Sequence, residues 1–103
     1  MKRELIGKVG VDSGQLLITD PCYITSQWKN TEFEGTNIPT GEFSYDGCCQ
    51  ATLSKKMSGQ LNYNLGHPGV GVAFSSGYGD GVYPVYAKKD AQGRIVEVII
   101  KMD

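Results

Sequence analysis

Apolar and polar residues alternate with a period of two along most of this chain. Successive side chains of a β-strand point to opposite faces of its sheet, so this period indicates strands with one buried and one solvated face. The stretches that alternate in this way are residues 5–11, 15–19, 42–54, 60–65, 70–75, 82–88 and 94–102. No long helical pattern separates them, which excludes a doubly wound α/β fold. We predict an all-β fold, mostly antiparallel, as a small barrel or sandwich of about seven strands. We expect at most one short helical turn, around Trp28 with Ser26 as its N-cap.

Turn signals between these stretches indicate how the strands connect. Residues 12–14, Asp-Ser-Gly, predict a turn that brings residues 15–19 back against residues 5–11. Pro21 ends the second of these strands, because proline cannot donate a hydrogen bond to a neighbouring strand. Near the other end of the chain, Gly93 suits a left-handed position that closes a hairpin. In the final strand, we expect alternate residues to face the core, namely Val96, Val98, Ile100 and Met102.

The longest alternating stretch, residues 42–54, can be interpreted as a hairpin or as one strand. Asp46-Gly47 is a typical two-residue hairpin turn. A hairpin at that point would place Phe43 opposite Gln50, so that apolar and polar faces would not match. We therefore predict one long strand, bent at Gly47. Its apolar face would carry Phe43, Tyr45, Gly47, Cys49, Ala51 and Leu53.

Length and charge restrict the class of protein. The chain has 103 residues, enough for one hydrophobic core, so we assign residues 1–103 to a single β-rich domain. Lys and Arg total 10 and Asp and Glu total 11, and the resulting net charge of -1 argues against nucleic-acid binding. No run of about 18 apolar residues is present, so we expect no membrane contact. The expected partner is an unknown small ligand or a protein, and the oligomeric state is open.

The cysteines and the first residues of the chain indicate the cytoplasm. The chain has an odd number of cysteines, namely Cys22, Cys48 and Cys49, and an odd number makes a poor disulfide framework. The first residues lack the apolar stretch and cleavage site of a signal peptide. With one histidine and no Cys-x-x-Cys pair, the chain has no normal spacing of ligands for zinc. We therefore expect a cytoplasmic protein that needs no cofactor.

The first candidate site is the segment Asp-Pro-Cys-Tyr at residues 20–23. A strand that ends here would place the Asp20 carboxylate and the Cys22 thiol at the rim of a sheet, where they can meet a ligand. In the structural interpretation, Asp20 caps a turn, Pro21 stops the strand and Cys22 is a small buried hydrophobe. We favour the structural interpretation for this segment.

The second candidate site is the glycine-rich segment at residues 77–85, Gly-Tyr-Gly-Asp-Gly-Val-Tyr-Pro-Val. Glycines on both sides of Asp80 allow positive φ angles and can expose backbone amides to an anion. A phosphate-binding glycine fingerprint needs a following helix, whereas a strand is predicted here, and a calcium loop needs more oxygen ligands than Asp80 alone. Tyr78 and Tyr83 could hydrogen-bond across the domain or stack on a ligand. The favoured interpretation is a tight loop in which Asp80 bonds its own turn.

Both candidate segments resemble small uncharacterised bacterial and phage proteins. One resemblance covers Asp-Ser-Gly at residues 12–14 and Ile-Thr-Asp-Pro-Cys-Tyr at residues 18–23. The other covers residues 76–86, with the signature G-x-G-D-G-x-Y-P-V, which is shared with the larger family labelled domain of unknown function 4241. The resemblance implies no activity. The positions of interest that it implies are Asp20, Tyr23, Asp80 and Tyr83.

We predict a non-catalytic binding or interaction module with a rim site near the glycine-rich loop. The expected ligand-binding residues are Asp20, Tyr23, Asp80 and Tyr83. With Asp12 they would converge at one end of the barrel, where two or three oxygens could hold a cation or a polar ligand. One alternative is a small hydrolase that uses a carboxylate, or Cys22 with the lone His67 as base. Another is a purely structural role, in which both motifs hold the fold together.

Overall fold

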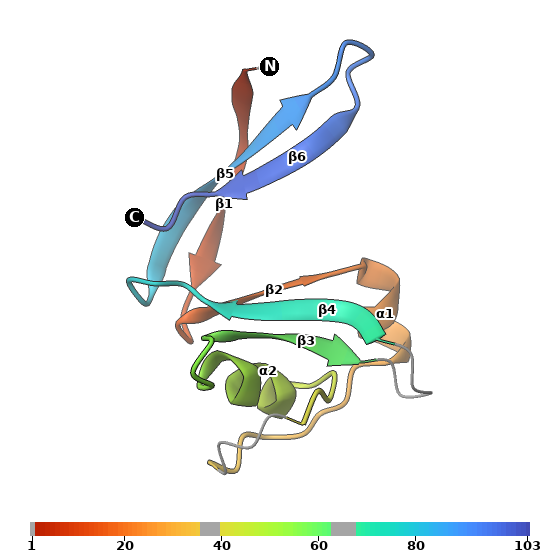
Figure 1. Ribbon diagram of the computed structural model, residues 1–103, viewed down its shortest axis with the longest axis vertical. Coiled ribbons are helices and arrows are strands. Elements are labelled where there is room, and N and C mark those ends of the chain that lie inside the picture. Colours follow the sequence, from red (N-terminus) through yellow and green to blue (C-terminus); the bar gives the residue numbers. More distant parts are fainter. Residues whose placement is uncertain (1, 36–39, 63–67) are drawn as a thin grey trace. The chain divides into compact units, whose positions relative to one another are not determined.

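The computed structural model describes residues 2–35, 40–62 and 68–103. These residues form six strands and two short helices (Figure 1). The chain divides into two compact units, of which unit 1 comprises residues 1–14 and 76–103, and unit 2 comprises Gln15–Ser75. The chain therefore leaves unit 1 after its first strand, completes unit 2, and then returns to finish unit 1.

Unit 1 is a three-stranded antiparallel sheet. Its strands are β1 (Arg3–Val11), β5 (Gly81–Lys89) and β6 (Ile95–Ile100), in the order β1-β5-β6. These bounds confirm the strands predicted at both ends of the chain. The β5–β6 hairpin closes at Gly93, which has the expected positive φ, 80°. The Asp90 carboxylate holds this turn by accepting hydrogen bonds from two of its backbone amides, at 2.9 and 3.0 Å.

The predicted inward face of the last strand is only partly confirmed. Ile100 and Met102 are half-buried, but Val96 and Val98 are 54% and 55% exposed. The reason is that β6 is an edge strand, and no helix among the described residues of unit 1 covers its faces. Burial is deepest on the central strand β5, where Ala87 is fully buried.

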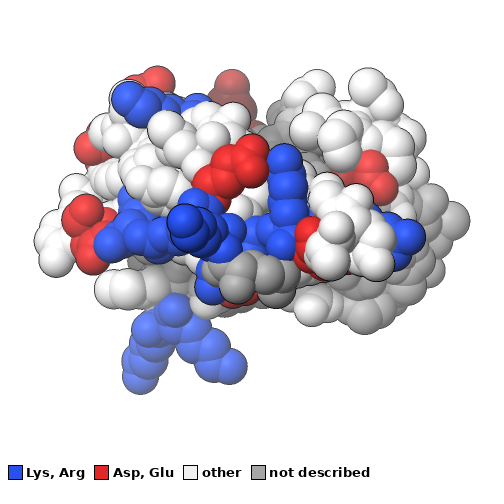
Figure 2. Space-filling model, turned by 90° about the horizontal axis from the view of Figure 1, so that it is seen from above, with Lys and Arg blue, Asp and Glu red and all other residues white. Residues whose placement is uncertain are grey.

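Charged side chains pair across the strands of unit 1. The Lys89 ammonium lies 3.2 Å from the Glu4 carboxylate, and the Lys88 ammonium lies 3.7 Å from the Glu97 carboxylate. On the face seen in Figure 2, acidic side chains lie among basic ones. Exposed pairs of this kind stabilise a fold by at most about 1 kcal/mol. Their larger effect is to keep the two edge strands from pairing with other chains.

Unit 2 packs a helix against a second three-stranded antiparallel sheet. The strands are β2 (Gln15–Thr19), β4 (Pro68–Ser75) and β3 (Ser58–Asn62), in the order β2-β4-β3 (Figure 1). The helix is α2 (Tyr45–Thr52), which contacts all three strands. The core of the unit consists of Phe43, Cys48, Ala51, Leu61, Val70 and Ala73.

Strand β2 does not pair with β1, so the predicted hairpin at residues 12–14 is wrong. Instead, β2 pairs with β4 over the whole of its length, and β1 pairs with β5. Leu17 of β2 packs against the core of unit 2, and pairing with β4 keeps it there. Gly14, with φ of 67°, lies where the chain passes from one unit to the other.

The largest error of the sequence prediction is the long strand over residues 42–54, most of which is helix α2. Ser44 is the N-cap, and its hydroxyl accepts a hydrogen bond from the Gly47 amide at 2.9 Å. Five consecutive residues from position 47 to 51 are buried, which an alternating strand cannot produce. Cys48 and Ala51, one helical turn apart, both reach the core. The period-two pattern of residues 42–54 therefore does not mark a strand, because most of these residues are helical.

The one predicted helical turn is displaced along the chain. The structure has α1 (Pro21–Ser26), with Asp20 as N-cap and proline in the first turn, where its missing amide costs no hydrogen bond. Ser26 ends this helix instead of capping the start of one. Trp28 follows the helix and packs edge-on against Phe43, with ring centres 5.0 Å apart.

The fold class is therefore mostly β, with two small helices where at most one helical turn was expected. The six described strands form two separate sheets, each with open edges, so the barrel alternative is wrong for the described residues and a seventh strand is not confirmed. Residues 63–65 of the predicted fourth strand lie outside the described residues. No helix in the described ranges is long and apolar enough to cross a membrane.

Candidate functional site

The glycine-rich loop, residues 76–81, is held by hydrogen bonds from its own side chains and from Tyr83. The Ser76 hydroxyl donates to the Gly79 carbonyl at 2.6 Å, and the Tyr83 hydroxyl donates to the same carbonyl at 2.7 Å. Ser76 is fully buried, so its hydroxyl must be satisfied within the fold. The backbone turns at Gly77 and Gly79, whose φ angles of 75° and 90° favour glycine.

Asp80 ties this loop to the end of the first segment of unit 1. Its carboxylate accepts a hydrogen bond from the Gly14 amide at 2.8 Å, and the Ser76 amide donates to the Gly14 carbonyl at 3.0 Å. Gly14 is thus bonded through both its amide and its carbonyl. The prediction that Asp80 bonds its own turn is therefore wrong, because its partner, Gly14, lies 66 residues away.

Tyr78 is the aromatic side chain that the loop presents to solvent. It lies between the two positive-φ glycines and is 80% exposed. Val82, just after the loop, is 67% exposed. Sequence reasoning named Tyr78 but did not place it among the site residues. The available signal was its position between Gly77 and Gly79, because glycines on both sides indicate a tight turn, and residues in turns usually lie at the surface.

In unit 2, the segment at residues 20–23 forms the start of helix α1. The Asp20 carboxylate accepts a hydrogen bond from the Cys22 amide at 3.1 Å and so caps the helix. This capping role agrees with the structural interpretation of Asp20. Tyr23 packs against the core of the unit. Cys22, in contrast, is exposed, and its expected burial is wrong.

The thiol of Cys22 is not activated by its surroundings. The hydrogen bond that it makes to the Asp20 carboxylate raises its pKa above the ordinary value, and the negative charge of Asp20 adds to this effect. A nucleophilic cysteine needs the opposite change, because the thiolate is the reactive form. The Cys48 thiol is less reactive than that of Cys22, because burial raises the pKa of Cys48 to about 11.

The four expected ligand-binding residues fall into two pairs. Asp80 and Tyr83 belong to unit 1, where both hydrogen-bond around the glycine-rich loop. Asp20 and Tyr23 belong to unit 2, where they start α1. Asp12 is exposed in unit 1. Convergence of all five residues into one site stays a prediction.

The chemistry available to the described side chains is limited. No group of three or more His, Cys, Asp or Glu within residues 2–35, 40–62 and 68–103 is arranged to hold a metal ion. His67, the base of the hydrolase alternative, lies outside the described residues.

Neither the curated proteins nor the solved structures contain a match to the chain. A family model described as "Protein of unknown function (DUF4241)" matches residues 9–100.

Proposed function

The chain belongs to the DUF4241 family, and from that premise we propose that it is a non-catalytic binding module whose rim site is the glycine-rich loop. The observation that carries this proposal is the exposed Tyr78 ring on a loop whose Gly79 carbonyl accepts hydrogen bonds from the hydroxyls of Ser76 and Tyr83. The matched range includes this loop.

An exposed tyrosine on a rigid loop suits binding for two physical reasons. Its ring offers a large apolar contact with a polar hydroxyl, and tyrosine is enriched among the residues that dominate binding energies. The loop is already ordered, so binding costs little conformational entropy. The hydrogen bonds of Ser76, Tyr83 and Asp80 keep the loop ordered, and Tyr78 would contact the ligand.

The proposed partner is a polar small ligand, a cation or a protein surface. Asp80 is exposed, so a ligand that covers Tyr78 could also reach its carboxylate. In this proposal Asp80 and Tyr83 have two roles, since they hold the loop and border the ligand.

The hydrolase alternative is the weaker one. In its cysteine form it needs a nucleophile with a lowered pKa, whereas the Asp20 carboxylate raises the pKa of Cys22. We also propose a cytoplasmic protein of bacterial or phage origin. Three free cysteines support the compartment, since reducing conditions keep thiols unpaired, and the signature at residues 77–85 supports the origin.

A thermal-shift screen of the whole chain tests the rim site. The probes are Ca²⁺, Mg²⁺, nucleotides and small carboxylic acids, each with the native chain and with Tyr78→Ala. A ligand at about a hundred times its Kd stabilises the native state by about 2.7 kcal/mol, which raises the Tm of a domain this size by several degrees. We expect Tyr78→Ala to melt like the native chain and to lose the shift.

Two further variants separate binding from folding. Asp80→Ala should lower the Tm without any ligand, because it removes the acceptor of the Gly14 amide. Tyr78→Phe keeps the ring and should keep most of the shift. If Tyr78→Ala retains the full shift, the ligand binds elsewhere and the rim-site proposal fails. If no probe shifts the native chain, the small-ligand form of the proposal fails.

A further inference from the structure

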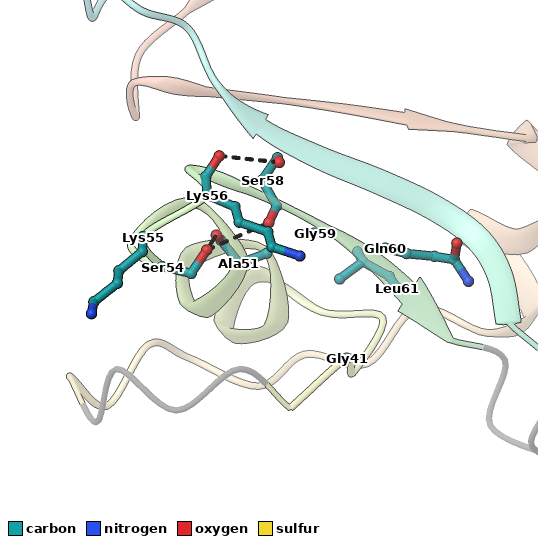
Figure 3. Close-up of a pocket in the computed structure, with 9 residues that line it drawn as sticks. All are labelled: Gly41, Ala51, Ser54, Lys55, Lys56, Ser58, Gly59, Gln60 and Leu61. Carbon is teal, nitrogen blue, oxygen red and sulfur yellow. Dashed lines mark hydrogen bonds between the residues drawn. The ribbon is translucent and has the colours of Figure 1, made fainter.

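We propose that a pocket at the C-terminal end of helix α2 binds a small carboxylate with an apolar chain. The pocket has a volume of about 410 Å³ and lies wholly within unit 2 (Figure 3). Helix α2, the turn after it and strand β3 supply most of its lining. The volume falls in the range of pockets that take small molecules, roughly 300–1,000 Å³. This site is independent of the glycine-rich loop, which belongs to unit 1.

The floor of the pocket is apolar. Ala51 and Leu61 line it, and both belong to the core of unit 2. Gly59 lies between them on β3, and a Cβ at this position would lie only 2.8 Å from the Cβ of Ala51. The glycine therefore allows helix and strand to approach closely. A ligand part that rests on this floor must itself be apolar, because the floor offers it no polar side chain.

The hydroxyl groups of the pocket already donate to the backbone. The Ser54 hydroxyl donates to the Ala51 carbonyl at 2.7 Å, and the Ser58 hydroxyl donates to the Lys56 carbonyl at 3.3 Å. Their protons are therefore not available to a ligand. The side-chain donors that remain for an anion at the rim are the lysine ammonium groups and the Gln60 amide.

Lys56 is the cation that can reach a ligand in this pocket. Figure 3 shows its side chain lying between α2 and β3, whereas the side chain of Lys55 points away from the other lining residues. Neither lysine forms an ion pair with a described residue, and no carboxylate is among the described residues that line the pocket. The described lining of the pocket therefore carries two lysine charges and no carboxylate.

A positive rim above an apolar floor selects an amphiphilic anion. One reachable ammonium matches one carboxylate, whereas a phosphate is usually held by several donors at once. The apolar chain of the ligand would lie over Gly59 and the edge of Ala51, whereas Leu61 is fully buried and offers the ligand no surface. A free fatty acid of medium chain length has both features, and octanoate is a suitable probe.

Titration of the whole, ¹⁵N-labelled chain with sodium octanoate tests the site by NMR. We expect amide shifts concentrated in residues 51–61. Sodium acetate, which lacks the chain, and octanol, which lacks the charge, should each bind at least several-fold more weakly. Lys56→Gln should weaken octanoate binding about two- to fivefold, the range expected when an exposed ion pair is lost. Lys55→Gln is the matched control and should change the Kd less than Lys56→Gln.

Each result decides for or against the pocket. Both lysines are exposed, so both variants should fold, and their NMR spectra show this directly. The proposal is overturned if octanoate does not bind, or if its shifts lie outside unit 2. It is also overturned if octanol binds as tightly as octanoate, or if the two lysine variants bind alike. Shifts at residues 51–61 that weaken in Lys56→Gln and not in Lys55→Gln support it.

Discussion

At the scale of single residues, Asp20 shows how a helix cap controls the reactivity of its neighbour. The Asp20 carboxylate raises the pKa of the exposed Cys22 thiol through a hydrogen bond and through its charge. We expect Asp20→Asn to lower that pKa and to speed alkylation of Cys22 by iodoacetamide at pH 8, by about twofold or more. The gain in thiolate outweighs its lower intrinsic nucleophilicity. Mass spectrometry over time measures the rate.

Asparagine is the informative replacement because it caps helices as well as aspartate does. The expected change therefore reports charge and not unfolding of α1. Cys48 and Cys49 are buried and serve as internal controls that should stay unmodified. An unchanged or slower rate in Asp20→Asn would show that the carboxylate does not govern this thiol.

Glu42 gives unit 2 a pH-dependent contribution to stability. Hydrogen bonds from Ser44 and Thr31 lower its pKa below the ordinary 4.5, and the charge of Lys29 acts in the same direction. A carboxyl whose folded pKa is depressed adds stability above its unfolded pKa, and this stability is lost as the pH falls through the folded pKa. We expect urea unfolding to show a loss of stability below about pH 4.5 that is smaller in Glu42→Gln. Equal losses in the two proteins would refute this role.

Residue chemistry was predictable where it is local. The capping role of Asp20 follows from its place before Pro21, whereas the prediction that Asp80 bonds its own turn is wrong. The partner of Asp80 did not follow, because Gly14 lies 66 residues earlier in the chain. The exposure of Cys22 was also missed because it depends on tertiary packing. The way helix α1 lies against the core decides which residues of the helix are buried, and the local sequence does not contain this information.

At the scale of elements, the start of α2 depends on one glycine. A Cβ at Gly47 would overlap the backbone carbonyl oxygen of Glu42, and this overlap requires the backbone to move. We expect Gly47→Ala to destabilise the protein by about 1–3 kcal/mol in urea unfolding. Gly10→Ala in β1 is the control, because nothing lies within 4 Å of its added Cβ. It should change stability by no more than about 0.5 kcal/mol. Similar losses in both variants would refute the steric explanation.

Elements were predictable where turn chemistry and alternation agreed. The hairpin at Gly93 and the strand that begins near Val70 satisfy both criteria, and both are present. Residues 45–52 met the criterion of alternation but not that of matching turn chemistry. Their helix depends on the Ser44 cap and on burial of Cys48 and Ala51 in a core that also holds Val70 and Ala73 of β4. The period of one segment cannot reveal such packing against another.

At the scale of the whole molecule, the two units differ in how much core each contains. The central strand β4 carries Val70 and Ala73, both almost fully buried, whereas four successive residues of the edge strand β6 are exposed. Slow hydrogen exchange requires opening of such buried structure. We expect amides of β4 to exchange more slowly than those of β6, as measured by NMR in deuterated buffer. Equal protection in both strands would indicate that the units open together.

The pairing of Gln15 with Ser75 determines the order of sheet assembly that has the lower entropic cost of loop closure. These two residues begin and end unit 2, and they are partners in the β2–β4 ladder. Before unit 2 folds, bringing β1 to β5 means closing a long flexible loop, whose entropic cost grows with its length. After unit 2 folds, its first and last residues lie side by side, so the entropy of closing this loop has already been lost. Folding of unit 2 thus converts a contact between distant parts of the chain into one that forms as readily as a short hairpin.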